Sequence, residues 1–148
     1  MHVNEMNEGV QVFLLDAATL AAIKNRDYHP DGVAMLEILQ TAFETGVTVE
    51  QDLWGRIRKQ MSALRRFIIE GHVESEPPNS RMTDVAVYMA ILNFWVANRK
   101  QCVDDALHFI SSSRPCETYS PSMTVCPDCD RCNFLRWLSD YAHSISST

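Results

Sequence analysis

Helix start and stop signals between residues 46 and 71 constrain the fold of this chain more than any other feature. Gly46 stands where a glycine commonly ends a helix. Thr48-Val-Glu-Gln51 is a capping box, in which the threonine and glutamine side chains each accept a hydrogen bond from the other residue's backbone amide. Gly71 supplies the next stop. These signals predict one helix that ends before Gly46 and another that runs from about Val49 to Ile69.

The rest of the chain continues the helical pattern. Apolar spacing predicts helices over residues 17–24, 33–45, 49–69, 82–100, 103–111 and 133–143, the first of them capped by Asp16. Residues 10–15 are too few for periodicity to separate a strand from a helix, so a short β pair of residues 10–15 with 119–125 stays an alternative. Pro77 and Pro78 predict a loop before the fourth helix. The expected fold is mostly α, a bundle of roughly five to six helices.

The segment Met82–Lys100 is apolar on nearly every side. A helix of this kind is normally covered by its neighbours, so we expect it to be the buried central helix of the bundle. The chain has 148 residues, of which 46% are hydrophobic, enough for one domain with a real core. We therefore expect a single domain over residues 1–148, with a helical body at 1–112.

The densest chemical signal is Cys126-Pro-Asp-Cys129-Asp-Arg-Cys132, which holds three of the five cysteines. A C-x2-C pair directs two thiolates at one ion while backbone amides donate hydrogen bonds to the sulfurs. Cys132 adds a third ligand where the last helix is expected to start, and the helix dipole stabilises a thiolate there. Because residues 112–132 are poor in apolar side chains, a metal would hold them to that helix. We therefore predict a structural zinc site in a C-terminal subregion, 113–148.

Tetrahedral zinc needs a fourth ligand. Cys116 is the first choice, because the residues that follow it are enough to loop back to the cluster. His108 and Cys102 are the fallback ligands from the preceding helix, and they lie about 240° apart around it, so we do not expect both to face one metal. His143 lies about 16 Å from Cys132 along a continuous helix, which excludes it as a partner of that cysteine.

Three other interpretations of the cysteines stay open. Reduced cysteines are often simply buried and packed. An iron–sulfur cluster also begins with C-x2-C-x2-C, but Arg136 occupies the position of the next expected cysteine. Cys126-Pro-Asp-Cys129 ahead of a helix resembles a thioredoxin-type dithiol, although no βαβ pattern surrounds it.

The expected helix over residues 49–69 has a charged side opposite its apolar stripe. Arg58 and Arg65 are seven positions apart, as are Lys59 and Arg66, so each pair lines up along the helix. The simplest interpretation is a solvated face. The alternative is a docking stripe for a phosphate backbone or an acidic partner.

Two short stretches resemble motifs of known families. Asp130-Arg-Cys132-Asn-Phe134 resembles a cysteine-containing stretch in the nonstructural nucleoprotein of bocaparvoviruses, which acts in viral RNA processing. Trp54-Gly-Arg-Ile57 resembles the core of a Bcl-2-family homology motif. The chain lacks the basic Arg/Ser-rich N-terminal region of the first family and a second motif of the other, so neither resemblance is adopted as an identification.

These observations favour a non-enzymatic, zinc-binding interaction or regulatory protein, such as a viral or phage accessory factor that engages a host protein. The net charge of −6 argues against a general nucleic-acid binder, and no phosphate-binding loop or catalytic motif is present. The alternatives are a nucleic-acid-associated regulator that uses the basic stripe, and a CxxC thiol redox protein. We expect a protein partner and no membrane, a homodimer being an alternative, in the cytoplasm or nucleus, where cysteines stay reduced.

Overall fold

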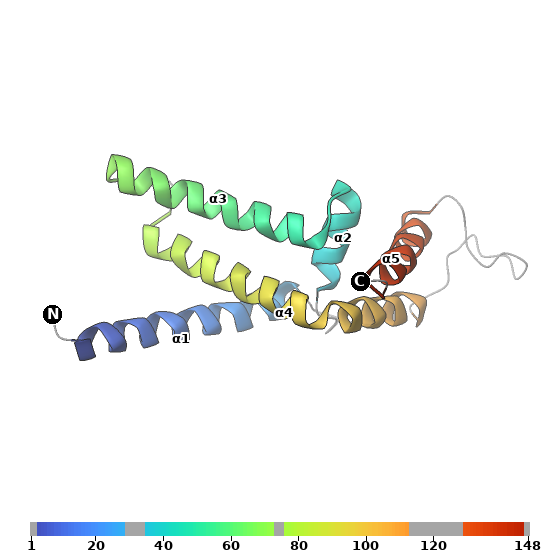
Figure 1. Ribbon diagram of the computed structural model, residues 1–148, viewed down its shortest axis with the longest axis horizontal. Coiled ribbons are helices and arrows are strands. Elements are labelled where there is room, and N and C mark those ends of the chain that lie inside the picture. The colour runs from blue at the N-terminus through green and yellow to red at the C-terminus, as the bar shows by residue number, and fades with distance from the viewer. Residues whose placement is uncertain (1–2, 29–34, 73–75, 113–128, 147–148) are drawn as a thin grey trace, which may run out of the picture.

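The computed structural model describes residues 3–28, 35–72, 76–112 and 129–146 (Figure 1). Five helices make up these ranges: α1 Val3–Tyr28, α2 Leu36–Thr45, α3 Val49–Glu70, α4 Pro78–Ser112 and α5 Asp130–Ser146. No strand occurs within them. The prediction of a mostly helical fold is therefore confirmed.

The N-terminal segment is one long helix, which corrects two expectations. Residues 10–15 are neither a strand nor the approach to a helix, and Asp16 lies inside α1 instead of capping it. Met6, Val10, Phe13, Ala17 and Leu20 alternate spacings of four and three residues, so one helical stripe continues through the segment. The proposed second half of the β pair, 119–125, lies outside the described residues.

The start and stop signals of α2 and α3 are confirmed in detail. Gly46 has φ 69° and its backbone N–H bonds to carbonyls of the last turn of α2. Thr48 Oγ1 accepts from Gln51 N–H at 3.2 Å, and Gln51 Oε1 accepts from Thr48 N–H at 3.0 Å. Gly71 has φ 76° and donates to Phe67 O at 2.8 Å. Only glycine adopts such a φ without strain, which explains why these two residues end the helices.

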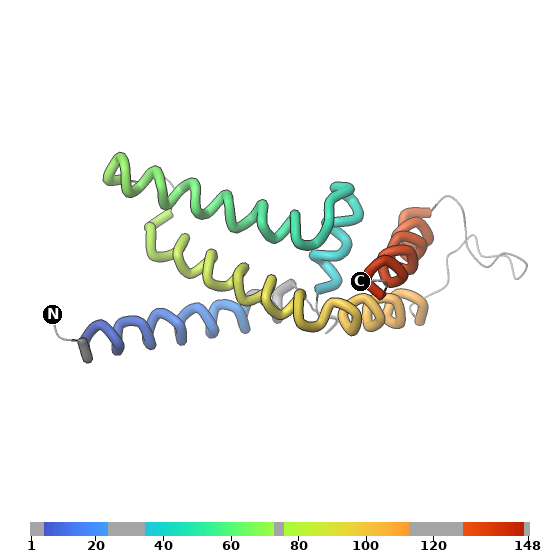
Figure 2. The backbone as a smooth tube through the Cα atoms, viewed as in Figure 1, coloured from blue at the N-terminus to red at the C-terminus, as the bar shows by residue number. Residues whose placement is uncertain are grey.

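The fourth and fifth expected helices, 82–100 and 103–111, are a single helix, α4, so the predicted break between them is wrong. Two side-chain hydrogen bonds span the expected break. Lys100 Nζ donates to Asp104 Oδ2 at 3.1 Å, and Gln101 Nε2 donates to Asp105 Oδ1 at 2.7 Å. Such pairs support helix where propensity alone does not. Instead of ending, α4 changes direction near its middle (Figure 2).

The helix α4 is central, because α1, α3 and α5 all pack against it (Figure 1). It is not buried on all sides, however. Met82, Met89 and Val96 lie seven residues apart on one face and are 46%, 48% and 63% exposed. The apolar pattern of the segment therefore predicted its position but not its degree of burial.

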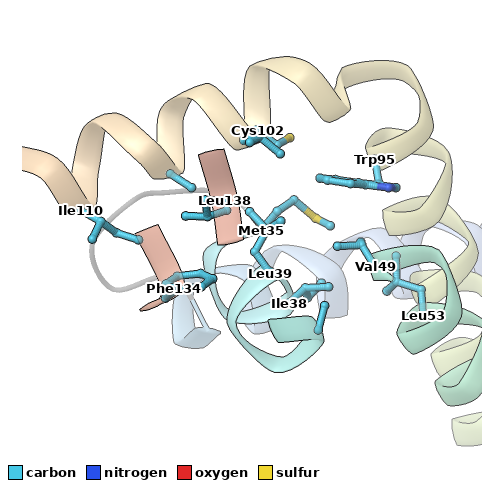
Figure 3. Packing of buried hydrophobic residues seen from close by; sticks show 13 residues of the cluster. Met35, Ile38, Leu39, Val49, Leu53, Trp95, Cys102, Ile110, Phe134 and Leu138 are labelled. Carbon is cyan, nitrogen blue, oxygen red and sulfur yellow. The ribbon is translucent and has the colours of Figure 1, made fainter. Parts of the chain in front are cut away.

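Most of the core lies at one end of the molecule, where α2, α5 and the start of α3 surround the C-terminal half of α4 (Figure 3). We call this part the core end. Its buried cluster consists of Met35, Ile38, Leu39, Ala42, Val49, Leu53, Trp95, Cys102, Val103, Ala106, Ile110, Phe134 and Leu138. At the other end, α1 and the C-terminal half of α3 flank the N-terminal half of α4 (Figure 1). We call that part the layer end.

A polar contact fixes α3 against α4 at the layer end. Arg81 is buried, and its Nη1 donates to Gln60 Oε1 at 2.7 Å. Gln60 Nε2 in turn donates to Asp84 Oδ2 at 3.2 Å. Since a hydrogen bond that involves a charged group is among the stronger ones, this network sets the register of the two helices.

Candidate functional site

The cysteine motif reaches the described chain at the start of α5. Cys132 N–H donates to Cys129 Sγ at 3.3 Å, and Asn133 N–H donates to Cys129 O at 3.0 Å. An amide that points at the sulfur favours its thiolate form, as does the N-terminal end of the helix. Cys129 therefore caps α5, with its sulfur in the place that a side-chain oxygen usually takes.

This turn is anchored to the core end. Arg131, which stands between the two cysteines, donates from Nη2 to the carbonyl oxygen of Ile110 in the last turns of α4. Phe134 and Leu138, on the same helix, are 7% and 0% exposed in the core cluster. The position of the cysteine pair is therefore fixed by packing and by a charge-assisted hydrogen bond.

The structure describes only some of the other predicted zinc ligands. Cys116 and Cys126 lie outside the described residues, and within the described ranges no group of three or more His, Cys, Asp or Glu side chains forms a metal site. His108 is exposed on α4. The zinc site and its fourth ligand therefore stay predictions.

Cys102 has a different environment from the cysteine pair. It is 4% exposed and lies on α4 between Trp95 and Ile110, beside Met35 and Leu138 (Figure 3). Burial, followed by the charge of Asp105, raises the pKa of the Cys102 thiol. Because it is enclosed in the apolar cluster, Cys102 fits the alternative of a packed cysteine.

The sequence did not predict a carboxylate–aromatic cluster that is formed by Glu50, Trp95 and Tyr141. Trp95 Nε1 donates to Glu50 Oε1 at 2.8 Å, and Tyr141 OH lies 3.5 Å from Glu50 Oε2. The rings of Trp95 and Tyr141 stack at 6.2 Å, and Trp137 stacks on Tyr141 at 5.0 Å. Because the three residues come from α3, α4 and α5, no local sequence pattern predicts that they meet.

The pKa values of Glu50 and Tyr141 are shifted in opposite directions. Burial alone would raise the pKa of Glu50, but hydrogen bonds from Trp95, its own backbone amide and Thr48, with the charge of Arg99, outweigh burial and lower it. Burial, with the neighbouring Glu50 charge, raises the pKa of Tyr141 to about 12. Both oxygens of Glu50 face donors, so the arrangement stabilises the fold and leaves the carboxylate poorly placed for proton transfer.

The predicted basic stripe is on the surface of α3. Arg58, Lys59, Arg65 and Arg66 are all exposed, and no ion pair joins them to a carboxylate in the described part of the chain. The apolar residues Trp54, Met61 and Ile68 lie seven residues apart beside them and are 54%, 51% and 79% exposed. Met61 and Ile68 therefore lie outside the buried side of α3, which Leu53, Ile57 and Leu64 form.

These residues form one mixed surface strip on α3: Trp54, Arg58, Met61, Arg65 and Ile68, at alternating spacings of four and three. We call it the α3 strip. Heptad spacing places all five on one side of a helix, about 100° from the side that packs on α4. The heptad spacing is visible in the sequence, but spacing alone does not distinguish this strip from a single apolar face with the cations opposite it.

In the described ranges, none of the helices combines the length and the apolar character that crossing a membrane requires. No protein-family model matches the chain, and neither a curated protein nor a solved structure matches it. The function is therefore argued from the chain's own residues.

Proposed function

We propose that this chain is a non-enzymatic interaction protein that docks a partner on the α3 strip and uses zinc to hold its C-terminal segment in place. The observation that carries the proposal is the exposure of Trp54, Met61 and Ile68 next to Arg58 and Arg65. Aromatic residues, methionine and arginine are the residue types enriched at protein interfaces.

The chemistry of the α3 strip indicates the class of partner. Apolar side chains at heptad spacing accept the apolar face of an amphipathic helix. The arginines between them favour acidic residues along the edge of that helix. The partner that fits is therefore an acidic amphipathic helix.

The metal would act on folding and not on the docking surface. Cys129 and Cys132 lie on the anchored start of α5, and Cys126 and Cys116 precede them in the chain. Zinc held by these thiolates would tie residues 113–128 to the core end, since binding of a structural zinc contributes directly to folding.

Metal content and thermal unfolding test the zinc site. We expect about one zinc per chain and a loss of melting temperature on chelation. Cys129→Ser with Cys132→Ser should abolish zinc binding, whereas the control Cys102→Ser should lower stability but keep the zinc. Metal-free protein with freely reacting thiols would contradict the site and favour the dithiol alternative.

Binding of a labelled helical peptide with a leucine face and glutamate edges tests the α3 strip. Fluorescence anisotropy should detect micromolar binding that weakens about tenfold or more in Arg58→Glu with Arg65→Glu. Arg136→Glu, an exposed cation on α5, is the matched control and should change nothing. Equal binding by all three proteins would overturn docking on this strip.

A nucleic-acid-associated role is the second candidate, favoured by the four exposed cations of α3. A labelled DNA duplex and a single-stranded RNA distinguish it from peptide docking. Binding that falls steeply with salt, and is lost on reversing Arg58, Lys59, Arg65 and Arg66, would support it. Absence of binding at low salt would remove it.

A further inference from the structure

The outward side of α1 carries apolar and acidic residues together. Val12, Leu15 and Ile23 are 58%, 67% and 51% exposed. Glu8 and Asp16 are also exposed and lie on either side of Val12 around the helix. We call this set the α1 strip. It faces away from Ala17, which is buried on the side that packs against α4.

The α1 strip complements the α3 strip in three respects. Both combine three apolar and two charged side chains, and the charges are acidic on α1 and basic on α3. Glu8 to Ile23 spans about 22 Å and Trp54 to Ile68 about 21 Å along a helix. The two acids are about 12 Å apart along the axis and the two arginines, Arg58 and Arg65, about 10 Å.

The two strips do not meet within one molecule. The helices α1 and α3 lie on opposite sides of α4 (Figure 1). Each is held there by its own contact with α4. Among the described residues neither strip covers the other, so a second molecule would cover the exposed apolar residues of both.

We propose that the chain self-associates, the α1 strip of one copy packing on the α3 strip of a second. In an antiparallel register, Glu8 stands opposite Arg65, Asp16 next to Arg58, and Val12 opposite Met61. This inference rests on the proposed function, because it names a second copy as the source of the acidic helix. A twofold dimer in which both strips face the partner forms this contact twice.

Light scattering coupled to size-exclusion chromatography tests the contact between about 1 and 100 µM. Wild-type protein should reach twice the 16.8 kDa mass of one chain. Glu8→Lys with Asp16→Lys should shift dissociation to at least about tenfold higher concentration, and Arg58→Glu with Arg65→Glu should do the same. Arg136→Glu is the control and should dimerise normally.

Mixing the two charge-reversed proteins is the decisive step. In the mixture every α1 strip meets an α3 strip of opposite charge, so the dimer should return although neither protein dimerises alone. Circular dichroism of each variant confirms that its helices are intact. A wild-type monomer throughout, or a dimer that survives both reversals, would overturn the proposal.

The peptide experiment separates this inference from the proposed function. A monomeric wild type that still binds the acidic peptide through Arg58 and Arg65 would leave docking in place and assign the partner helix to another protein. If the wild type dimerises and the two charge-reversed proteins dimerise on mixing, but the peptide does not bind, docking of foreign helices is refuted and the self-contact is retained.

Discussion

The two ends of this molecule use apolar residues in opposite ways. At the core end, side chains from α2, α3, α4 and α5 close over Trp95, which is fully buried. At the layer end, Ile68 is 79% exposed although it also sits on a helix packed against α4. Every large hydrophobic residue that is exposed in the described ranges belongs to α1, α3 or α4, and none to α2 or α5.

The difference shows that burial depends on how many helices surround a position, not on the residue type. Four helices, α2, α3, α4 and α5, contribute to the buried cluster of the core end, whereas at the layer end α1 and the C-terminal half of α3 pack mainly against α4. Soluble proteins seldom leave contiguous apolar patches on their surface without a use. We therefore expect the core end to supply most of the stability and the exposed apolar residues outside it to serve the proposed binding surface.

Replacing the buried Trp95 of the core end and the exposed Trp54 of the α3 strip tests this contrast most strongly. Trp95→Ala should lower the free energy of unfolding by about 3–5 kcal/mol, because it leaves a cavity and removes a donor from Glu50. Trp54→Ala should change it by less than about 0.5 kcal/mol in monomeric protein. Urea unfolding followed by circular dichroism measures both. Similar losses at the two sites would erase the distinction.

The carboxylate of the core end gives a smaller effect that depends on pH. Glu50→Gln should cost about 1.5 kcal/mol at neutral pH, since the hydrogen bond from Trp95 Nε1 loses its charged acceptor. The folded-state pKa of Glu50 is lowered, so its contribution is present above the usual value of 4.5 and lost as pH falls below it.

Wild-type protein should therefore lose stability more steeply than the variant on acidification. Unfolding free energies compared from neutral pH down through the region below 4.5 measure this difference. Parallel pH curves for the two proteins would show that Glu50 has no such role.

The capping box provides the smallest test. Thr48→Ala should cost about 1 kcal/mol, because the backbone amide of Gln51 loses its acceptor at the start of α3. Thr19→Ala on α1 is the matched change at the layer end, where the hydroxyl only bonds back to Leu15 O. It should fall within about 0.5 kcal/mol of wild type by urea unfolding. A larger loss at Thr19 than at Thr48 would reverse the comparison.

The sequence predicted those parts of the fold that short-range chemistry determines. Gly46, the Thr48–Gln51 box and Gly71 act within one helical turn, and all three are confirmed. The continuity of α1 and α4 was missed because weak local breakers such as Asn98 are overridden when a helix packs along its length.

The candidate sites show the same difference between local features, which the sequence predicts, and contacts between distant residues, which it does not. The turn between Cys129 and Cys132 is local, and its sulfur-directed amide is present as expected. The Glu50, Trp95 and Tyr141 cluster joins residues far apart in the chain, so no spacing rule finds it. The α3 strip was visible as a repeat, but a repeat does not say which of two faces a neighbouring helix covers.

The placement of Trp54 has a spectroscopic consequence. Its indole is in water while Trp95 is enclosed and Trp137 is stacked between rings, so the three fluorophores of the chain differ in accessibility. Arg58, one helical turn from Trp54, concentrates anions near that indole. Iodide should therefore quench the red-shifted part of the emission selectively, so that Trp54 would report occupancy of the α3 strip without an attached dye.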